Sequence, residues 1–258
     1  MSHEFRASPL PLPLSLRPMN RPDTSDWLDT APGRALLDGE SRVLADVLSD
    51  LVGFETLQVG RWGDGTRLAG PARTQRHWLV APDASGPYAI RASHDALPFA
   101  TGSVEGVLLP HTLEYAANPH EVLREVERVL MGEGQVAICG FNPIGPWGLR
   151  NRVTGGRYLP YAERLLGEGR IRDWLRLLGF EIAAARPFLF VPPWSRPATP
   201  DPDGWLERRG PELMGPVAAA YVVKARKRVR ALTPIRPAWR AVPRVGAAAA
   251  EPTLRNAA

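Results

Sequence analysis

Residues 95–141 read DALPFATGSVEGVLLPHTLEYAANPHEVLREVERVLMGEGQVAICGF, and this stretch decides the fold class. Two of its runs, at 105–110 and 135–141, are continuously apolar, as strands are when helices cover both faces of their sheet. Between them, residues 118–130 carry apolar side chains at helical spacing, with charged side chains on the opposite face. A strand, an amphipathic helix and a second strand in this order indicate an α/β domain with a mostly parallel sheet.

The same alternation continues on both sides of this stretch. Further short apolar runs bounded by Gly, Pro or Asp predict strands at 55–60, 77–81, 88–90, 180–188 and 218–225. We therefore expect a Rossmann-like open sheet, mostly parallel, with helices on both faces and ligands at the carboxyl ends of the strands. A helix around 171–178 and a long Pro/Trp-rich excursion at 187–217 flank the first of the last two strands, which are predicted to form an antiparallel hairpin edge.

Composition divides the chain into three parts. Its 258 residues and 44% apolar content suit one catalytic-size domain. We predict this domain at 26–225, after a disordered N-terminal segment at 1–25 in which Met19 is an alternative start. The domain is expected to open with two short helices, because Thr30 followed closely by proline is typical of a helix start. A basic, Pro/Ala-rich disordered tail is predicted at 226–258.

The positive charge of the chain is concentrated at its C-terminal end. Residues 224–258 hold nine Lys or Arg and one acidic residue, a charge of +8, whereas the whole chain carries +5 and the preceding residues −3. Such a tail on a slightly acidic domain is typical of a solvated, disordered segment. Contact with RNA through the tail is kept as a minor hypothesis, which predicts salt-sensitive binding that is lost on truncation at Val223.

Several classes of protein are not supported by the sequence. The single Cys139 cannot form an internal disulfide, so we expect a reducing compartment, the cytoplasm. No apolar run approaches the roughly 20 residues that cross a bilayer, so no membrane span is predicted. The five histidines show no metal-ligand spacing with each other or with Cys139, so no metal site is predicted. The Gly-x-Ser-x-Gly turn of many serine hydrolases is absent from the sequence.

The stretch 95–141 resembles the second half of the S-adenosylmethionine (SAM)-binding core in the type 11 family of class I SAM-dependent methyltransferases. That family has a polar–acidic–Ala–x–Leu–Pro–Phe step, a Gly-Ser-[Phe/Val]-[Asp/Glu] step, a strand ending in [His/x]-x-Leu-Glu-[His/Tyr], and a Pro-led helix closing with Arg-Val-Leu-x-x-Gly-Gly. The matching residues are Asp95, Ala96, Leu97, Pro98, Phe99, Gly102, Ser103, Glu105, His111, Leu113, Glu114, Pro119, Glu125, Arg128, Val129, Leu130 and Gly134. The resemblance implies SAM as the cofactor and a methyl acceptor as the substrate.

The resemblance assigns adenine contacts to the first matched residues. Asp95 would accept a hydrogen bond from the adenine amino group, and the backbone amide of Ala96 would reach the ring nitrogen. Leu97 and Phe99 would offer apolar surface to the base. The alternative for Asp95 is a cap or turn residue that precedes Leu97.

The end of the predicted fourth strand carries two further candidates. His111 lies at a position that is close to the cofactor in the family, at the edge of the sheet where ligands bind. Its alternative is a histidine that packs in a loop and is hydrogen-bonded locally. Glu114 is expected to support the start of the following helix, where a carboxylate is electrostatically favoured.

The glycine-rich turn departs from the family pattern. The family has Asp-x-Gly-x-Gly-x-Gly after the first strand, whereas residues 58–65 read QVGRWGDG, with Gln58 at the acidic position and the second glycine one position late. Glycines let backbone amides approach the methionyl carboxylate of SAM. The predicted contacts are Gly60, Gly63 and Gly65. The bulky Trp62 is expected to narrow this approach.

The first half of the sheet is predicted to be trimmed. Gly70 and Pro71 should break or greatly shorten the helix that follows the turn. Only about a dozen residues separate the second strand from Asp95, too few for a full helix and a strand. The carboxylate that binds ribose would then be Asp83, whose alternative is a plain turn residue.

Two functions remain open at this stage. The first is a SAM-dependent methyltransferase whose unknown acceptor sits near residues 141–152 and 187–217, with Asn142 and Trp147 as candidate contacts. No catalytic residue is assigned, because methyl transfer needs mainly alignment of donor and acceptor and exclusion of water. The second is a catalytically degenerate module of the same fold with weak or no SAM binding. Neither the acceptor nor the oligomeric state is indicated.

Overall fold

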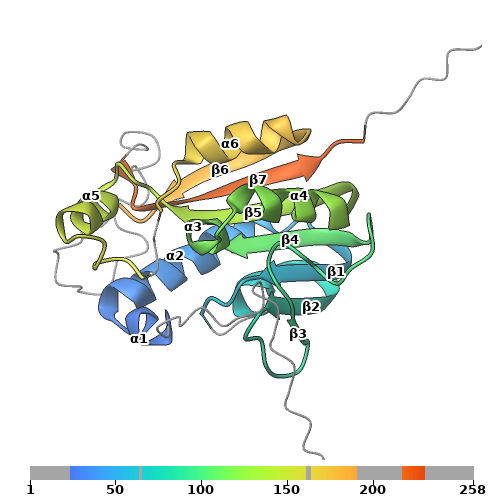
Figure 1. Cartoon of the computed structure of the whole chain (residues 1–258), viewed down its shortest axis with the longest axis horizontal. Helices are drawn as coiled ribbons and strands as arrows, with labels where there is room; N and C mark the ends of the chain where they lie inside the picture. Colours follow the sequence, from blue (N-terminus) through green and yellow to red (C-terminus); the bar gives the residue numbers. More distant parts are fainter. Residues whose placement is uncertain (1–23, 64–65, 161–163, 191–216, 230–258) are drawn as a thin grey trace, which may run out of the picture.

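The computed structural model describes residues 24–63, 66–160, 164–190 and 217–229 (Figure 1). The described strands form one seven-stranded sheet in the order β3-β2-β1-β4-β5-β7-β6. They are β1 Val52–Val59, β2 Arg73–Ala81, β3 Ala89–Arg91, β4 Val104–Pro110, β5 Leu130–Phe141, β6 Phe180–Phe188 and β7 Ala220–Lys227. Residues 1–23 of the predicted N-terminal segment, Gly65, and most of the predicted excursion and tail lie outside the described residues, and residues 24 and 25 begin α1.

The direction of the strands confirms the predicted fold class. All pairings among β1, β2, β3, β4 and β5 are parallel. β7 runs antiparallel to both of its neighbours, with Val222 opposite Cys139 of β5 on one side and Arg186 of β6 on the other. The last strand in the chain is therefore inserted between β5 and β6, and the antiparallel edge is formed as predicted.

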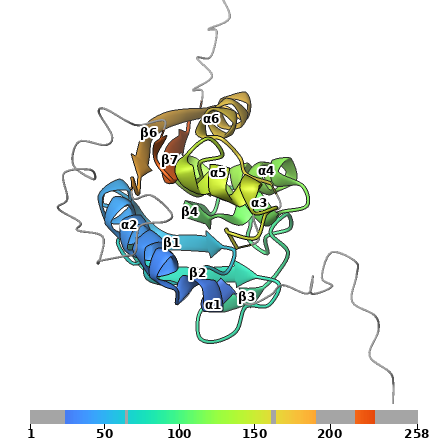
Figure 2. The ribbon, with the colours of Figure 1, turned by 90° about the vertical axis from the view of Figure 1, so that its left-hand side faces the viewer.

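Helices cover both faces of this sheet. They are α1 Thr24–Leu28, α2 Ala31–Val47, α3 Thr112–Tyr115, α4 Pro119–Val129, α5 Pro146–Val153 and α6 Glu168–Leu177, with a 3-10 turn, η2, at Thr66–Ala69. Figure 2 shows α1 and α2 on one side of the sheet and α4 and α6 on the other. Thr30 caps α2 by accepting a hydrogen bond from the Gly33 amide at 3.3 Å, but α2 has 17 residues and is longer than the short helix predicted.

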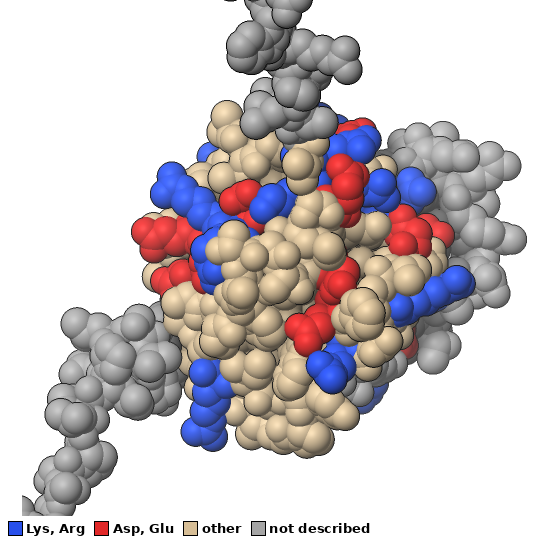
Figure 3. All heavy atoms as spheres, turned by 90° about the vertical axis from the view of Figure 1, so that its right-hand side faces the viewer, with Lys and Arg blue, Asp and Glu red and all other residues tan. Residues whose placement is uncertain are grey.

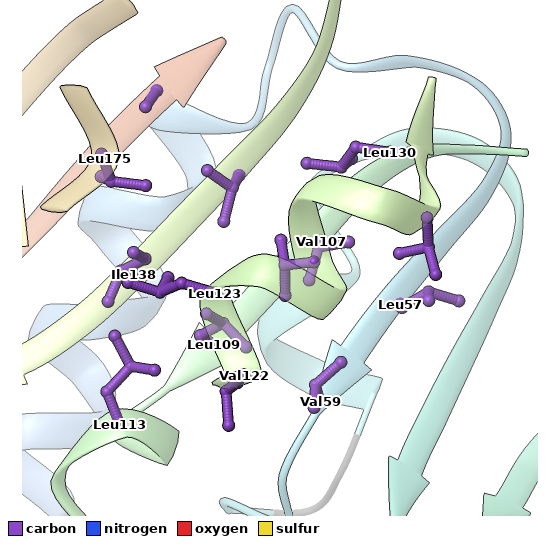
Figure 4. Close-up of a cluster of buried hydrophobic side chains, with 14 of the residues drawn as sticks. Leu57, Val59, Val107, Leu109, Leu113, Val122, Leu123, Leu130, Ile138 and Leu175 are labelled. Atoms are coloured by element: carbon purple, nitrogen blue, oxygen red, sulfur yellow. The ribbon is translucent and has the colours of Figure 1, made fainter. Parts of the chain in front are cut away.

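The alternation of side chains along the strands creates two hydrophobic cores. In β4, Val107 and Leu109 point into the core shared with α4 and α6, whereas Leu108 points into the core shared with α2. Figure 4 shows the first of these cores, in which Val107 and Leu109 meet Leu123 of α4. Both faces of the central strands are thus buried, which explains their continuously apolar sequence.

The first half of the sheet is trimmed, as predicted. Only η2 lies between β1 and β2 in the described residues, and η2 ends just before Gly70 and Pro71. No helix lies between β2 and β3, where every residue is described, and β3 has three residues. The helix α2, which precedes β1, packs against η2 and covers the second face of the sheet.

Charged side chains of both signs are mixed on the face of the molecule where β7 ends (Figure 3). There Arg226 and Arg228 lie 3.9 and 3.1 Å from Glu133, and Lys227 lies 2.9 Å from Glu127. The first basic residues of the predicted tail are therefore paired with carboxylates of the domain. Within the described part of the chain, no helix is both long and apolar enough to span a membrane.

Candidate functional site

The carboxyl edge of the parallel strands brings most of the predicted site residues to one side of the domain. Gly60 follows β1, Asp83 follows β2, Asp95 follows β3, His111 follows β4 and Asn142 follows β5. Because these five strands run in the same direction, their carboxyl ends share one edge of the sheet, where open α/β sheets bind ligands.

The turn after β1 requires glycine. Gly60 has a φ of 98° and Gly63 a φ of 60°, both in the left-handed region that glycine adopts without strain. A Cβ atom on Gly60 would collide with the Tyr115 hydroxyl and lie 2.5 Å from Thr112 Oγ1. The Gly60 amide donates to the Val80 carbonyl oxygen of β2 over 2.8 Å. The turn is therefore fixed between β2 and the residues that follow β4.

Trp62 does not lie over the glycines, so the expected narrowing of the approach is not observed. Its side chain is 1% exposed and belongs to the core beneath α2. The indole ring stacks at a tilt on His111 with 4.3 Å between ring centroids, and its Nε1 donates to Glu40 Oε2 over 2.8 Å. The sequence alone does not show this orientation, because a side chain in a turn is oriented by partners that are distant along the chain.

Gln58 occupies the position of the family's acidic residue and is fully buried. Its Nε2 faces the carbonyl oxygens of Gly60 and Trp62 at 3.4 and 3.5 Å. Its Oε1 has no hydrogen-bond partner among the described residues. The amide therefore approaches carbonyl groups of the turn, whereas a carboxylate at this position could only accept hydrogen bonds.

His111 is enclosed by carboxylates. Its side chain is 2% exposed, with Nδ1 2.7 Å from Glu114 Oε2 and Nε2 2.6 Å from Glu40 Oε1. Both ring nitrogens are engaged, which favours the locally hydrogen-bonded interpretation over direct cofactor contact. Glu114 lies in the first turn of α3, near a helix start as expected, and it also accepts a hydrogen bond from the Phe141 amide at the end of β5 over 2.8 Å.

The charges around His111 change its protonation. Burial by itself lowers the pKa of His111, but the charges and hydrogen bonds of Glu114 and Glu40 outweigh burial and raise this pKa to about 9. Burial raises the pKa of Glu114 above its ordinary value, although His111 and the Phe141 amide act in the opposite direction. At neutral pH the imidazole is therefore a cation held between carboxyl groups.

The segment after β3 presents Asp95 and Ala96 to solvent and turns Leu97 inward. Asp95 is exposed and accepts a hydrogen bond from the Ser93 hydroxyl, and the Ala96 amide is 3.3 Å from the Ser93 carbonyl oxygen. Leu97 is 4% exposed and packs in the core, which argues against contact of its side chain with the base, and this contact stays a prediction. Phe99 is partly buried against the same core.

Two residues of α4 hold this segment in place. Glu125 accepts a hydrogen bond from the Leu97 amide over 2.7 Å. Arg128 donates to the carbonyl oxygens of Leu97 and Phe99, each over 3.0 Å, and pairs with Glu125 over 2.7 Å. We call this pair the Glu125–Arg128 clamp. Glu125 and Arg128, which both match the family pattern, therefore have a structural role.

Asp83 lies in the exposed turn two residues after β2. Its carboxylate is 3.8 Å from the guanidinium of Arg61, and both side chains are about half exposed, at 48% and 50%. The contact brings the turn after β2 next to the glycine turn after β1. Asp83 thus lies within reach of a side chain of the glycine turn, and its role as the ribose-binding carboxylate stays a prediction.

The predicted acceptor contacts have structural partners. Asn142 Nδ2 donates to the Ala218 carbonyl oxygen over 2.9 Å, and its Oδ1 accepts from the Ile144 amide over 3.1 Å. Trp147 is 2% exposed and packs edge-on against Trp27 at 6.2 Å between ring centroids. Contact of either side chain with an acceptor stays a prediction, and the burial of Trp147 argues against it.

Comparisons with known proteins agree with this geometry. Residues 72–138 match the family model of a methyltransferase domain. The fold is similar to a SAM-dependent methyltransferase of Thermotoga maritima, with a TM-score of 0.60, 19% identity, and coverage of 80% of this chain and 95% of that one. A SAM-dependent methyltransferase of Archaeoglobus fulgidus gives a TM-score of 0.56 and 14% identity, over 80% of this chain and all of its own.

The chain also has relatives of similar sequence. It is 35% identical to the uncharacterized protein YafS of Escherichia coli over 171 residues, which are 66% of this chain and 70% of YafS. It is 27% identical over 174 residues to an uncharacterized protein of Mycobacterium tuberculosis, which covers 65% of this chain and 60% of the relative. The chain belongs to the class I SAM-dependent methyltransferase family.

Within this chain, sequence reasoning missed Glu40, which lies in α2 outside the matched residues 72–138. Its position did carry a signal, because Leu36, Glu40 and Leu44 recur every four residues and share the buried face of α2. A carboxylate on the apolar face of a helix requires a buried partner. Tyr115 and Thr112 were also not assigned, since only the fold shows that they contact Gly60.

The described part of the chain holds no recognisable metal site. Its His, Cys, Asp and Glu side chains form no group of three or more that could hold an ion, where residues 24–63, 66–160, 164–190 and 217–229 are considered. The carboxylates around His111 are instead paired with its imidazole and with N–H donors of the chain.

Proposed function

We propose that this chain binds SAM at the carboxyl edge of its sheet and transfers the methyl group to an acceptor that is not yet identified. One observation carries the proposal. The glycine turn and two exposed carboxylates, Asp83 and Asp95, follow the carboxyl ends of three neighbouring parallel strands, β1, β2 and β3. Such a set of groups suits a ligand that has a carboxylate, a ribose diol and an adenine amino group.

Each part of the ligand has a matching group on the chain. The backbone around Gly60 and Gly63 would hold the methionyl end, because glycine carries no side chain to block it. The carboxylate of Asp83 would accept hydrogen bonds from the ribose hydroxyls once it is released from the exposed contact with Arg61. Asp95 would accept a hydrogen bond from the adenine amino group. The Ala96 amide, now 3.3 Å from the Ser93 carbonyl oxygen, would donate to a ring nitrogen of adenine instead.

The chemistry asks little of the protein. When bound, SAM supplies a methyl group on a positively charged sulfur. The residues of the chain need to orient the ligand and the acceptor and to exclude water from the reacting atoms. The segment from Asn142 to α5 follows β5 at the same edge, and we propose that the acceptor binds beside it. A cytoplasmic location stays a prediction.

A second candidate is a binding module of the same fold that has lost SAM binding. Two observations favour it, namely Gln58 in place of the family's acidic residue and the four-residue η2 in place of a helix after the turn. This candidate predicts weak or no binding of SAM. It gives no purpose to the exposed Asp83 and Asp95.

Calorimetric titration with SAM and S-adenosylhomocysteine separates the two candidates. The enzyme proposal predicts dissociation constants of tens of micromolar or tighter, and about a tenfold or larger loss in Asp95→Asn, because one charge-assisted hydrogen bond is removed. Asp173→Asn is the matched control, since Asp173 is exposed on α6 and pairs with Arg176 of the same helix at 3.5 Å. No binding to the wild-type protein at millimolar ligand would exclude the enzyme.

A further inference from the structure

A buried chain of hydrogen bonds connects the glycine turn with α2 and with the ends of β4 and β5. Trp62 of the turn donates to one oxygen of Glu40, and the other oxygen of Glu40 contacts His111. The second ring nitrogen of His111 contacts Glu114, which accepts from the Phe141 amide. Every contact measures between 2.6 and 2.8 Å. One network therefore joins four elements of the fold.

The network holds charge in a place from which water is excluded. Glu40, His111 and Glu114 are 0%, 2% and 4% exposed. An ionised carboxylate can only accept hydrogen bonds, so an imidazole that faces a carboxylate from each nitrogen is satisfied when both nitrogens carry protons. An imidazole that donates from both nitrogens, with Trp62 and the Phe141 amide as further donors to the two carboxyl groups, leaves none of these groups without a partner.

Stability alone does not explain such a cluster. Taking charges out of water is costly, and well-packed apolar side chains of the same volume often give an equal or larger free energy of unfolding. Hydrogen-bonded charges differ from apolar contacts in fixing distance and direction. The cluster therefore fixes the position of the groups that it contacts.

The part that is fixed is the glycine turn. Trp62 stands between Gly60 and Gly63, and its ring is held from one side by the hydrogen bond to Glu40 and from another by the stack on His111. Because Trp62 is part of the turn, holding its ring also holds the backbone of the turn. On the side of β4, Gly60 rests against Thr112, which donates to the Val59 carbonyl oxygen.

We propose that Glu40 and His111 are positioning residues, which hold the glycine turn through Trp62 in the conformation that receives the methionyl end of SAM. The proposal rests on the proposed function, and it assigns a role in the cofactor site to an N-terminal helix outside the matched methyltransferase segment. It also explains why a tryptophan replaces the small residues expected in such a turn. The indole N–H gives the turn a fixed attachment to α2.

The variants Glu40→Gln, Trp62→Phe and the double variant test this coupling. The first change leaves one acceptor oxygen for two donors, and the second keeps an aromatic ring while removing the indole N–H. We expect each single change to raise the dissociation constant for S-adenosylhomocysteine about tenfold, as the loss of one buried hydrogen bond implies. If Glu40 acts through Trp62, the double variant binds no more weakly than the weaker single variant.

A spectroscopic readout follows the turn without ligand. In protein labelled with 5-fluorotryptophan, the Trp62 resonance is the one that is missing from Trp62→Phe. We expect this resonance to shift or broaden in Glu40→Gln. The matched control is Asp50→Asn, which removes the negative charge that pairs with the buried Lys224 at the opposite end of β1. It should lower the melting temperature and leave both the Trp62 resonance and the dissociation constant unchanged.

The outcomes separate the two proposals. Binding by the wild type, with a weaker Glu40→Gln and a non-additive double variant, supports the positioning role. Equal binding by wild type and Glu40→Gln, an unchanged Trp62 resonance, or strictly additive losses would overturn the positioning role and leave the proposed function standing. Absence of binding by the wild type would overturn both. If Glu40→Gln does not fold, equal binding by Trp62→Phe and wild type overturns the positioning role on its own.

Discussion

Two segments that begin at the carboxyl edge are held by clusters of charged side chains, but in different surroundings. The glycine turn is held through Trp62 by the buried groups Glu40, His111 and Glu114. The segment after β3 is held by the Glu125–Arg128 clamp, whose side chains are 15% and 34% exposed. Burial makes the first arrangement costly to break, since a lost partner leaves a charge without water. The second remains open to water, which can replace a lost partner.

The largest effect is expected from His111→Gln. Removing the imidazolium leaves two buried carboxyl groups facing each other, a type of change that costs on the order of 3–5 kcal/mol. Urea unfolding measures this loss in the free energy of unfolding. His77→Gln is the matched control, because His77 in β2 is only partly buried and faces no carboxylate in the described structure. A loss below about 1 kcal/mol for His111→Gln would contradict the buried cluster.

A smaller effect is expected from Arg128→Ala. The change removes two hydrogen bonds to carbonyl oxygens of Leu97 and Phe99 and the pair with Glu125, all partly open to water. We expect a loss of about 1–2 kcal/mol in urea unfolding. Arg176→Ala, in an exposed pair on α6, should change stability by less than about 0.5 kcal/mol. Equal losses of unfolding free energy in the two variants would show that the clamp does not stabilise the segment after β3.

The contributions of the buried cluster and of the clamp to the free energy of unfolding should change with pH in opposite directions. The pKa of His111 is raised from 6.5 to about 9, so its contribution to stability is complete below pH 6.5 and is lost as pH rises through about 9. The hydrogen bond from Arg128, the largest influence, lowers the pKa of Glu125 below 4.5, so its contribution is present above that pH and is lost on acidification.

Unfolding free energies measured across pH reveal both trends. The difference between wild type and His111→Gln should shrink between about pH 6.5 and 9.5, and the difference between wild type and Glu125→Gln should shrink below pH 4.5. A difference for His111→Gln that stays constant through pH 9 would mean that His111 carries no charge in the folded protein. A constant difference for Glu125→Gln would mean that its carboxylate is not favoured by Arg128.

The smallest effect on stability is expected from Arg61→Ala. The pair with Asp83 is 3.8 Å long and half exposed, so its loss should change the free energy of unfolding by less than about 0.5 kcal/mol. Because the change frees the Asp83 carboxylate, binding of S-adenosylhomocysteine should be unchanged or tighter. Calorimetry would contradict the ribose role of Asp83 if Asp83→Asn bound the ligand as tightly as wild type.

The sequence was sufficient to predict the sheet and its trimmed half. Continuous apolar runs mark strands buried on both faces, and Gly70 with Pro71 leaves no room for a helix after the turn. These features depend on neighbours along the chain. The carboxylates at Asp83 and Asp95 were also predicted to lie at the carboxyl edge, and they are exposed there.

The parts that could not be predicted depend on partners far apart in sequence. Trp62 points into the core because Glu40 and His111 lie there, 22 and 49 residues away along the chain. Leu97 turns inward because α4 binds its backbone on both sides. In both cases the residue type matched more than one role, and only the packing of the helices decided between them.

The most direct test of the cofactor site is a titration of ¹⁵N-labelled protein with S-adenosylhomocysteine, followed through backbone amide shifts. We predict that the shifts concentrate at Gly60, Gly63 and Ala96 on the carboxyl edge, while Gly102 and Gly132 near the opposite edge stay unchanged. An unchanged spectrum at millimolar ligand, or shifts that centre on Gly102 and Gly132, would contradict a SAM site at the carboxyl edge.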